Sequence, residues 1–140
     1  MTNKDKRFFN IAKETARLSD FHGTNVGAAV VEGNRVISTG FNSSKTRPLQ
    51  EQYNRYRNFK DIRDSIPRAH AEINALSPLI GKELDWDRIS IYIYREKKTG
   101  ERGCSRPCPA CLRLIKDLGI KNIYFIDENE DFVKEKVLKE

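Results

Sequence analysis

Hydrophobic and polar positions in the first third of the chain follow first a helical and then a strand spacing. In residues 7–19 the apolar side chains recur three and four positions apart, which is typical of an amphipathic helix. Two short runs, residues 26–31 and 35–41, flank a Glu-Gly-Asn turn whose Gly and Asn tolerate positive φ, and this pattern predicts a β-hairpin. The first third of the chain is therefore predicted to be a helix followed by two strands.

The remainder of the chain alternates helices and strands. Large side chains at both odd and even positions of residues 89–95 predict a central strand that is covered on two faces. Helices are predicted over residues 69–77 and 108–118, the second ended by Gly119, and a further strand over residues 122–127. Residues 131–138 fit a last strand or a short helix, and residues 49–62 have apolar positions at helical spacing. This order predicts the α/β class, with a single mixed sheet and helices packed on it.

Length and composition are those of an ordinary globular domain. The 140 residues are 38% hydrophobic and 33% charged, so we predict a single domain over residues 1–140 that buries its own core. We find no apolar run of the length that a membrane span needs, and no apolar stretch near the N-terminus that resembles a signal peptide. Three cysteines, two of them in a C-x-x-C motif, argue against a disulfide scaffold and favour a cytoplasmic protein.

Most of the excess positive charge lies in one segment. The net charge is +6, which favours an anionic partner such as a nucleotide phosphate or a polynucleotide. The segment of about residues 43–67, which we treat as a basic insert, leads to Arg68 and also carries three aromatic residues. When Arg68 is included, the cationic residues are Lys45, Arg47, Arg55, Arg57, Lys60, Arg63 and Arg68. The acidic residues of the same segment are Glu51, Asp61 and Asp64. It could be a solvated helix, a clamp for a substrate phosphate, or a track for a polynucleotide with stacked bases.

Two short motifs carry the chemistry that is most specific in the chain. His70-Ala71-Glu72 supplies an imidazole and a carboxylate, and Cys108-Pro-Ala-Cys111 supplies two thiols at the start of a predicted helix. His70, Cys108 and Cys111 are three ligands for a tetrahedral zinc ion, and an open fourth position is typical of catalytic zinc sites. Glu72 can then act as the base beside the metal, taking a proton from zinc-bound water and passing it to a leaving group.

Other interpretations of each motif are weaker. A C-x-x-C motif alone could be a redox pair or half of a four-cysteine zinc site. Only Cys104 remains as a further cysteine, and we expect it to be a packed or loop thiol; His22 is far upstream in a turn. A thioredoxin-like redox protein would carry a βαβ unit before the motif, and the sequence pattern does not show one there. A catalytic zinc site with one Zn²⁺ per chain is the interpretation that accounts for both motifs together.

These motifs identify a resemblance to the zinc-dependent cytidine and deoxycytidylate deaminase superfamily, over nearly the whole chain. The resemblance implies a three-layer α/β/α cytidine-deaminase-like fold with a mixed five-stranded sheet. It also implies that His70, Cys108 and Cys111 bind zinc and that Glu72 is the proton shuttle. The matching segments are Val26–Val31, Gly40-Phe41-Asn42, His70–Leu76 and Ser105–Cys111.

The resemblance further implies how the substrate is held. Asn42 is expected to hydrogen-bond the base or sugar, and the Ala71 backbone is expected to touch the base edge. Ala28 and Ala29 fit either close approach of a base or plain packing. Arg47 and Arg68 are our choices for a phosphate clamp, because they are the basic residues nearest in sequence to Asn42 and His70.

The substrate remains open between several classes. The leading hypothesis is hydrolytic deamination of a cytosine nucleotide or nucleoside, such as dCMP, to the uracil product with release of ammonia. Such an enzyme is a hydrolase acting on C–N bonds of cyclic amidines, with a small-molecule partner. The alternatives are a deaminase of cytosine or adenine in single-stranded DNA or RNA, and a non-catalytic zinc module that binds nucleotides. Members of the superfamily usually form oligomers, and a homo-oligomer is expected here.

Overall fold

A mixed β-sheet forms the centre of the protein. The computed structural model describes residues 1–20, 23–56 and 69–137. The strands are β1 (Asn25–Glu32), β2 (Arg35–Phe41), β3 (Ile89–Glu96), β4 (Arg102–Gly103), β5 (Asn122–Ile126) and β6 (Phe132–Lys136). The main path of the sheet is β2-β1-β3-β5-β6, in which only β3 and β5 pair in parallel. The mixed sheet predicted from the sequence is therefore confirmed, but in the described residues it has six strands rather than the predicted five. Residues 132–136 form a strand.

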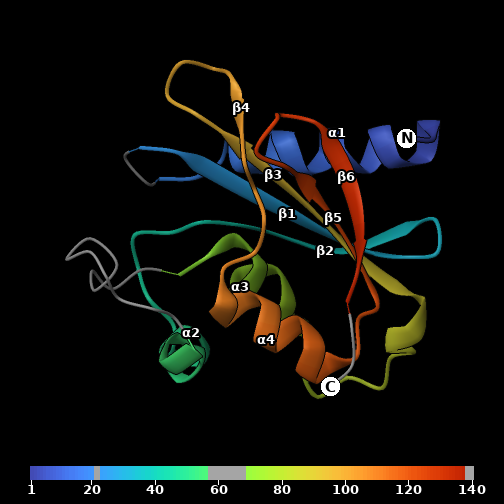
Figure 1. Cartoon of the computed structure of the whole chain (residues 1–140). Coiled ribbons are helices and arrows are strands. Elements are labelled where there is room, and N and C mark those ends of the chain that lie inside the picture. The colour runs from blue at the N-terminus through green and yellow to red at the C-terminus, as the bar shows by residue number, and fades with distance from the viewer. Residues whose placement is uncertain (21–22, 57–68, 138–140) are drawn as a thin grey trace.

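One strand was not predicted. β4 pairs antiparallel with the end of β3, with Arg95 opposite Gly103 and Glu96 opposite Arg102. A strand of two residues is too short to show alternation in the sequence. The hairpin that joins β3 to β4 projects beyond the sheet before the chain turns down to the next helix (Figure 1).

Helices cover both faces of the sheet and give the predicted three layers. They are α1 (Asn3–Ala16), α2 (Pro48–Tyr53), α3 (Ala71–Leu76) and α4 (Pro109–Leu118). α1 packs on one face, and α3 and α4 pack on the other (Figure 1). α4 ends at Gly119, whose φ of 93° is the left-handed C-cap that the sequence predicts. None of the helices in the described ranges is long and apolar enough to cross a membrane.

Two helices are shorter than their sequence patterns. The predicted helix 69–77 begins only at Ala71, because His70 has the extended backbone of an N-cap, with φ −79° and ψ 155°. The helical spacing over residues 49–62 corresponds to α2 followed by a 3₁₀ turn at Asn54–Tyr56, and the rest of that segment lies outside the described residues.

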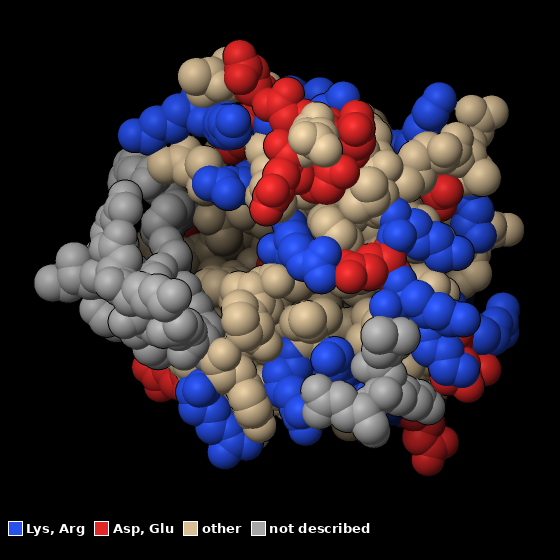
Figure 2. Space-filling model, viewed as in Figure 1, with Lys and Arg blue, Asp and Glu red and all other residues tan. Residues whose placement is uncertain are grey.

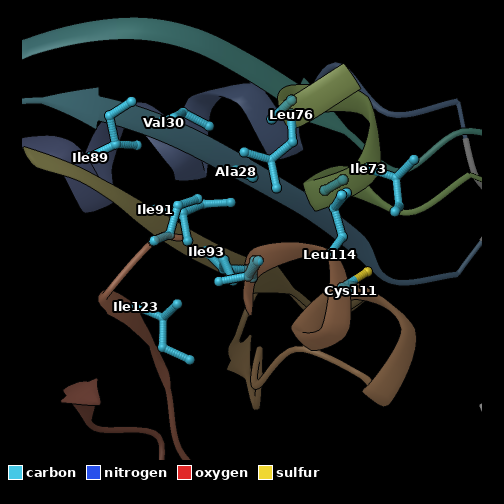
Figure 3. Packing of buried hydrophobic residues seen from close by; sticks show 14 of the residues in the cluster. Ala28, Val30, Ile73, Leu76, Ile89, Ile91, Ile93, Cys111, Leu114 and Ile123 are labelled. Atoms are coloured by element: carbon cyan, nitrogen blue, oxygen red, sulfur yellow. The ribbon is translucent and has the colours of Figure 1, made fainter. Parts of the chain in front are cut away.

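Alternation along β3 separates two hydrophobic clusters. Ile91 and Ile93 face α3 and α4, where Ile73 and Leu114 complete the cluster that Figure 3 shows. Tyr92 and Tyr94 face α1 on the opposite side. The neighbouring strand follows the same rule, since Ala28 is fully buried in the first cluster and Ala29 in the second. Packing therefore accounts for both alanines.

Two glycines let helices approach the sheet closely. A Cβ atom on Gly40 of β2 would lie 2.4 Å from the backbone nitrogen of Ala75 in α3. A Cβ atom on Gly27 of β1 would lie 2.1 Å from the carbonyl oxygen of Ala12 in α1. Real side chains never tolerate such distances, so each glycine fixes how one helix sits on the sheet.

Candidate metal centre and active site

The starts of α3 and α4 bring the three predicted metal ligands together. His70 is the N-cap of α3 and Cys108 is the N-cap of α4, with Cys111 one turn further along that helix. The His70 Nδ1 atom lies 3.3 Å from Cys111 Sγ and 3.4 Å from Cys108 Sγ. The three ligand atoms all lie within 4.8 Å of one another. His70 lies 38 positions before Cys108 and 41 before Cys111, and the fold makes the three residues one group.

The geometry of this group fits one Zn²⁺. Tetrahedral zinc with Zn–N of about 2.0–2.1 Å and Zn–S of about 2.3 Å separates nitrogen and sulfur ligands by roughly 3.6 Å. The observed distances of 3.3 and 3.4 Å are close to that separation. The donor set of one imidazole and two thiols is also the soft set that zinc prefers. Three protein ligands leave the fourth position for a water or a substrate.

Hydrogen bonding within the group favours a thiolate. The hydrogen bond from Cys111, followed by that with His70, lowers the pKa of Cys108 to about 4, against the effect of burial. Burial raises the pKa of the Cys111 thiol well above its usual value, and hydrogen bonding to Cys108 acts in the same direction. Cys108 is thus ionised at neutral pH, in the form that binds metal.

Glu72 is a buried carboxyl group beside the predicted ligands. It lies in the first turn of α3 and is 5% exposed. Burial raises the pKa of Glu72, and the nearby His70 partly opposes this shift. Because His70 is the extended N-cap rather than a mid-helix residue, His70 and Glu72 face the same cavity although they are two positions apart. This is the arrangement that the sequence predicts for a base beside the metal.

The basic insert contributes a residue that positions His70 and that sequence reasoning missed. Gln50 of α2 is fully buried, and its Oε1 atom accepts a hydrogen bond of 2.9 Å from the His70 backbone N–H. The ends of the insert are also joined, since Ser43 and Ala69 exchange two backbone hydrogen bonds of 2.9 and 3.1 Å. The burial of Gln50 and its contact with His70 appear only in the folded chain, so no signal in the sequence points to this residue. The described part of the insert therefore supports the start of α3.

A cavity of about 300 Å³ opens in front of the group, and a hollow is visible on this face of the surface (Figure 2). Its wall includes His70, Ala71, Glu72 and Cys108 on the helical side. The other side is formed by Thr24, Val26, Asn42, Arg95, Cys104, Ser105 and Arg106. Of these, only Asn42 was predicted. Arg95 could have been found from alternation, since it follows Ile91 and Ile93 on the same face of β3.

Asn42 lines the cavity but its amide also supports β1. Its Oδ1 atom accepts a hydrogen bond of 2.9 Å from the Val26 N–H, and its Nδ2 donates one of 3.0 Å to the Thr24 carbonyl. One amide hydrogen and one lone pair remain for a ligand. Asn42 therefore holds the entry to β1 and reaches the cavity at the same time.

The phosphate clamp of Arg47 and Arg68 stays a prediction, because only one of the two residues lies in the described ranges. Arg47 is exposed and lines a different hollow, beside Lys45 and Pro78. Arg68 lies outside the described residues, as does His22. Cys104 is half-buried, lines the cavity and is not part of the ligand group.

Comparison with known proteins agrees with this geometry. The sequence model of the cytidine and deoxycytidylate deaminase zinc-binding region matches residues 2–127. The chain belongs to the cytidine and deoxycytidylate deaminase family. It is accordingly a hydrolytic deaminase that acts on C–N bonds, and the His70-Cys108-Cys111 group is placed to bind the Zn²⁺ of this zinc-binding family.

Individual relatives are distant in sequence. A protein of Mycobacterium phage D29 described as deoxycytidylate deaminase is 30% identical over 134 residues, which cover 89% of this chain and 95% of that protein. An uncharacterized deaminase of Aliivibrio fischeri is 30% identical over 133 residues, covering 91% of this chain and 76% of that protein.

Solved structures show the same fold. A cytidine deaminase from Burkholderia pseudomallei has a TM-score of 0.63 at 19% identity, and covers 98% of this chain and 94% of its own. The dCMP deaminase of cyanophage S-TIM5, solved in complex with dCMP and dUMP, has a TM-score of 0.60 at 22% identity, and covers 91% of this chain and 85% of its own.

Proposed function

We propose that this protein deaminates a free cytosine nucleotide of the dCMP type, giving the uracil nucleotide and ammonia, with one Zn²⁺ per chain. The observation that carries the proposal is the meeting of His70, Cys108 and Cys111 with the buried Glu72 in one cavity. The phage relative described as deoxycytidylate deaminase and the S-TIM5 enzyme, which was solved with dCMP and dUMP, support the choice of nucleotide.

Glu72 moves the protons of the reaction. Bound zinc supplies an activated water, because the metal lowers the pKa of a bound water from about 15.7 to about 7. Glu72 takes one proton from the attacking water and delivers it to N3 of the cytosine ring as the water oxygen bonds to C4. It then takes the second proton from that oxygen and gives it to the amino group, which leaves C4 as ammonia while the C4 carbonyl forms. Its burial keeps bulk water away from this transfer.

The first turn of α3 and the end of β2 orient the base. The backbone of Ala71 lines the cavity at the first position of α3, where helix N–H groups have no partner within the helix. The Asn42 amide faces the base or the sugar with its remaining hydrogen and lone pair. Together they place C4 of the ring beside the metal ligands.

The surroundings of the cavity favour a monomeric nucleotide over a polynucleotide. The turn between β5 and β6 carries Asp127, Glu128, Glu130 and Asp131, and acidic side chains gather on this part of the surface (Figure 2). Asp127 and Glu128 line a small hollow together with Cys104 and Arg106, which also line the cavity. A single strand that left the cavity on this side would bring its phosphates against these carboxylates.

A substrate panel tests the proposal. The purified, zinc-loaded protein is incubated with cytidine, deoxycytidine, dCMP, dCTP, adenosine and a labelled single-stranded oligonucleotide, and ammonia and the deaminated base are measured. We expect the highest kcat/KM for dCMP. Deamination of the oligonucleotide without that of any monomer would reject the proposal in favour of a polynucleotide deaminase. Binding of dCMP without turnover of any substrate would indicate a non-catalytic nucleotide-binding module.

A further inference from the structure

The lining of the cavity carries two cationic side chains in addition to the metal ligands and Glu72. Arg95 and Arg106 both line it, and Glu72 is the only carboxylate in the described part of the wall. A neutral nucleoside has no group that would match two guanidinium groups, whereas a nucleotide has its phosphate. In the proposed reaction zinc and Glu72 act on the base, so these two positive charges are available for another part of the substrate.

Arg95 occupies a position where the preceding residues of its strand are core residues. Alternation along β3 puts it on the same face as Ile91 and Ile93, opposite Val26 of β1. The side chain is half-buried, and its Nε atom is buried without a hydrogen-bond partner. Its Nη1 atom donates a hydrogen bond of 3.3 Å to the carbonyl oxygen of Cys104. No carboxylate in the described ranges lies within ion-pair distance of Arg95.

The half-buried guanidinium of Arg95 has no anionic partner among the described residues to compensate for its partial removal from water. A guanidinium group has five N–H donors, and withdrawing a charge from water is costly unless an anion and hydrogen bonds compensate. Its planar fork matches two oxygens of a phosphate. The part of the cavity next to Arg95 therefore carries a positive charge that no carboxylate of the described residues neutralises.

Arg106 differs from Arg95 because its charge is already paired. Its Nη2 and Nη1 atoms lie 2.9 and 2.8 Å from the two carboxylate oxygens of Glu135, and its guanidinium lies 5.3 Å from the centre of the Phe125 ring. These contacts fix Arg106 at the rim of the cavity. A phosphate bound at Arg106 would compete with Glu135 for the guanidinium group. Arg95, in contrast, pairs with no carboxylate among the described residues.

We propose that Arg95 binds the phosphate of the cytosine nucleotide and so makes the enzyme prefer nucleotides to nucleosides, with Arg106 as a second donor at the rim. This assignment rests on the proposed function, since it concerns the same cavity. It needs neither Arg47 nor Arg68 for the phosphate. The phosphate is recognised at the end of β3, next to the hairpin that carries β4.

The test compares Arg95→Met with Arg102→Met. Both remove one positive charge from the same hairpin, but Arg102 lies 4.6 Å over the ring of Phe132 and does not line the cavity. Because a hydrogen-bonded charge pair contributes about 1.5–3 kcal/mol, Arg95→Met should lower kcat/KM for dCMP roughly 10- to 100-fold. The kcat/KM for deoxycytidine should stay within about threefold, as should both substrates with Arg102→Met. Equal losses for dCMP and deoxycytidine, or equal losses in the two variants, would overturn the assignment.

A binding measurement separates this inference from the proposed function. Calorimetry with the products should show that the wild-type protein binds dUMP more tightly than deoxyuridine and that Arg95→Met removes the difference. If the wild-type protein shows this preference but deaminates no monomer, the proposed function fails and the phosphate site stands. If dUMP and deoxyuridine bind equally, the phosphate site fails whatever the activity. Arg95→Lys, which keeps the charge but lacks the fork, should retain part of the preference and replaces Arg95→Met if that variant does not fold.

Discussion

The face of the sheet under α1 is filled by aromatic rings, whereas the face under α3 and α4 is aliphatic and opens into a cavity at the end of β3. On the α1 face, Tyr92 and Tyr124 stack with ring centres 4.1 Å apart, and Phe9 stacks on Phe132 at 4.3 Å. On the other face, Ile91 and Ile93 give way to Arg95.

This difference shows how one strand serves two purposes. Odd-numbered positions of β3 pass from the core into the active site, and even-numbered positions stay within a closed aromatic layer. Substitutions that disturb the packing under α1 should therefore lower the stability alone. Substitutions that disturb the packing under α3 and α4 should also lower the catalytic rate. The predictions that follow test this separation.

The largest effect is expected from removing a metal ligand. Cys111→Ser should lower the zinc content from about one per chain to nearly none and lower kcat/KM by more than about 1,000-fold, because the zinc-activated nucleophile is lost. Metal analysis and an ammonia assay measure the two effects. The matched control is Cys104→Ser, since Cys104 lines the cavity without belonging to the ligand group, and its zinc content should be unchanged. Full zinc binding by Cys111→Ser would contradict the assignment.

A pair of glycine substitutions compares the two faces directly. Gly27→Ala and Gly40→Ala each push a Cβ atom into a helix backbone and should lower the free energy of unfolding by about 1–3 kcal/mol. Only Gly40→Ala displaces α3, which carries Glu72 and follows His70. Displacement of reacting groups by about 1 Å can cost roughly 100-fold, so kcat should fall at least tenfold in Gly40→Ala.

Chemical denaturation and kcat measured on folded protein distinguish the two variants. Gly27→Ala should keep the wild-type kcat, because α1 does not line the cavity. An equal fall of kcat in both variants would show that the two faces are coupled and that the separation is incorrect.

The smallest effect is expected from removing a single hydrogen bond in the aromatic layer. Tyr92 donates a hydrogen bond of 2.6 Å to Asp5. Tyr92→Phe should lower the free energy of unfolding at pH 7 by about 1 kcal/mol and leave kcat unchanged. A change in kcat would argue against the separation of the two faces.

The pH dependence of the same variant provides a second check. Burial raises the pKa of Asp5, but hydrogen bonds from Tyr92 and Thr2 outweigh it and hold the pKa below its usual value. The stability that this provides is present above the pKa of Asp in the unfolded chain, about 3.9, and is lost as the pH falls through the lower pKa of the folded state. The stability difference between wild type and Tyr92→Phe should therefore shrink below about pH 4.

The parts of the site that lie in short local motifs could be predicted from the sequence. The parts that depend on contacts between distant segments could not. His70, Glu72, Cys108 and Cys111 lie in two short motifs at helix starts, so their spacing alone indicates which side chains converge. The sheet and its helices could be predicted for the same reason, because periodicity and caps act over a few residues.

The rest depends on contacts between distant segments. Alternation alone places Arg95 on the face of Ile91 and Ile93, but only contacts between distant segments show that this end of the face lines the cavity. Gln50 supports His70 from 20 positions away, because its side-chain Oε1 accepts a hydrogen bond from the His70 backbone N–H, and no motif records this contact. Arg47 is close to Asn42 in sequence, but the chain leaving β2 carries it to another hollow. Proximity in sequence was a poor guide where the chain changes direction.

The central claim is that zinc at His70, Cys108 and Cys111 works together with Glu72 as the proton carrier. The most direct test measures zinc content and ammonia release from dCMP for the wild-type protein and Glu72→Gln side by side. We predict about one zinc per chain in both proteins and a rate that is roughly 100- to 10,000-fold lower in the variant. A Glu72→Gln protein that holds zinc and releases ammonia at the wild-type rate would contradict the account.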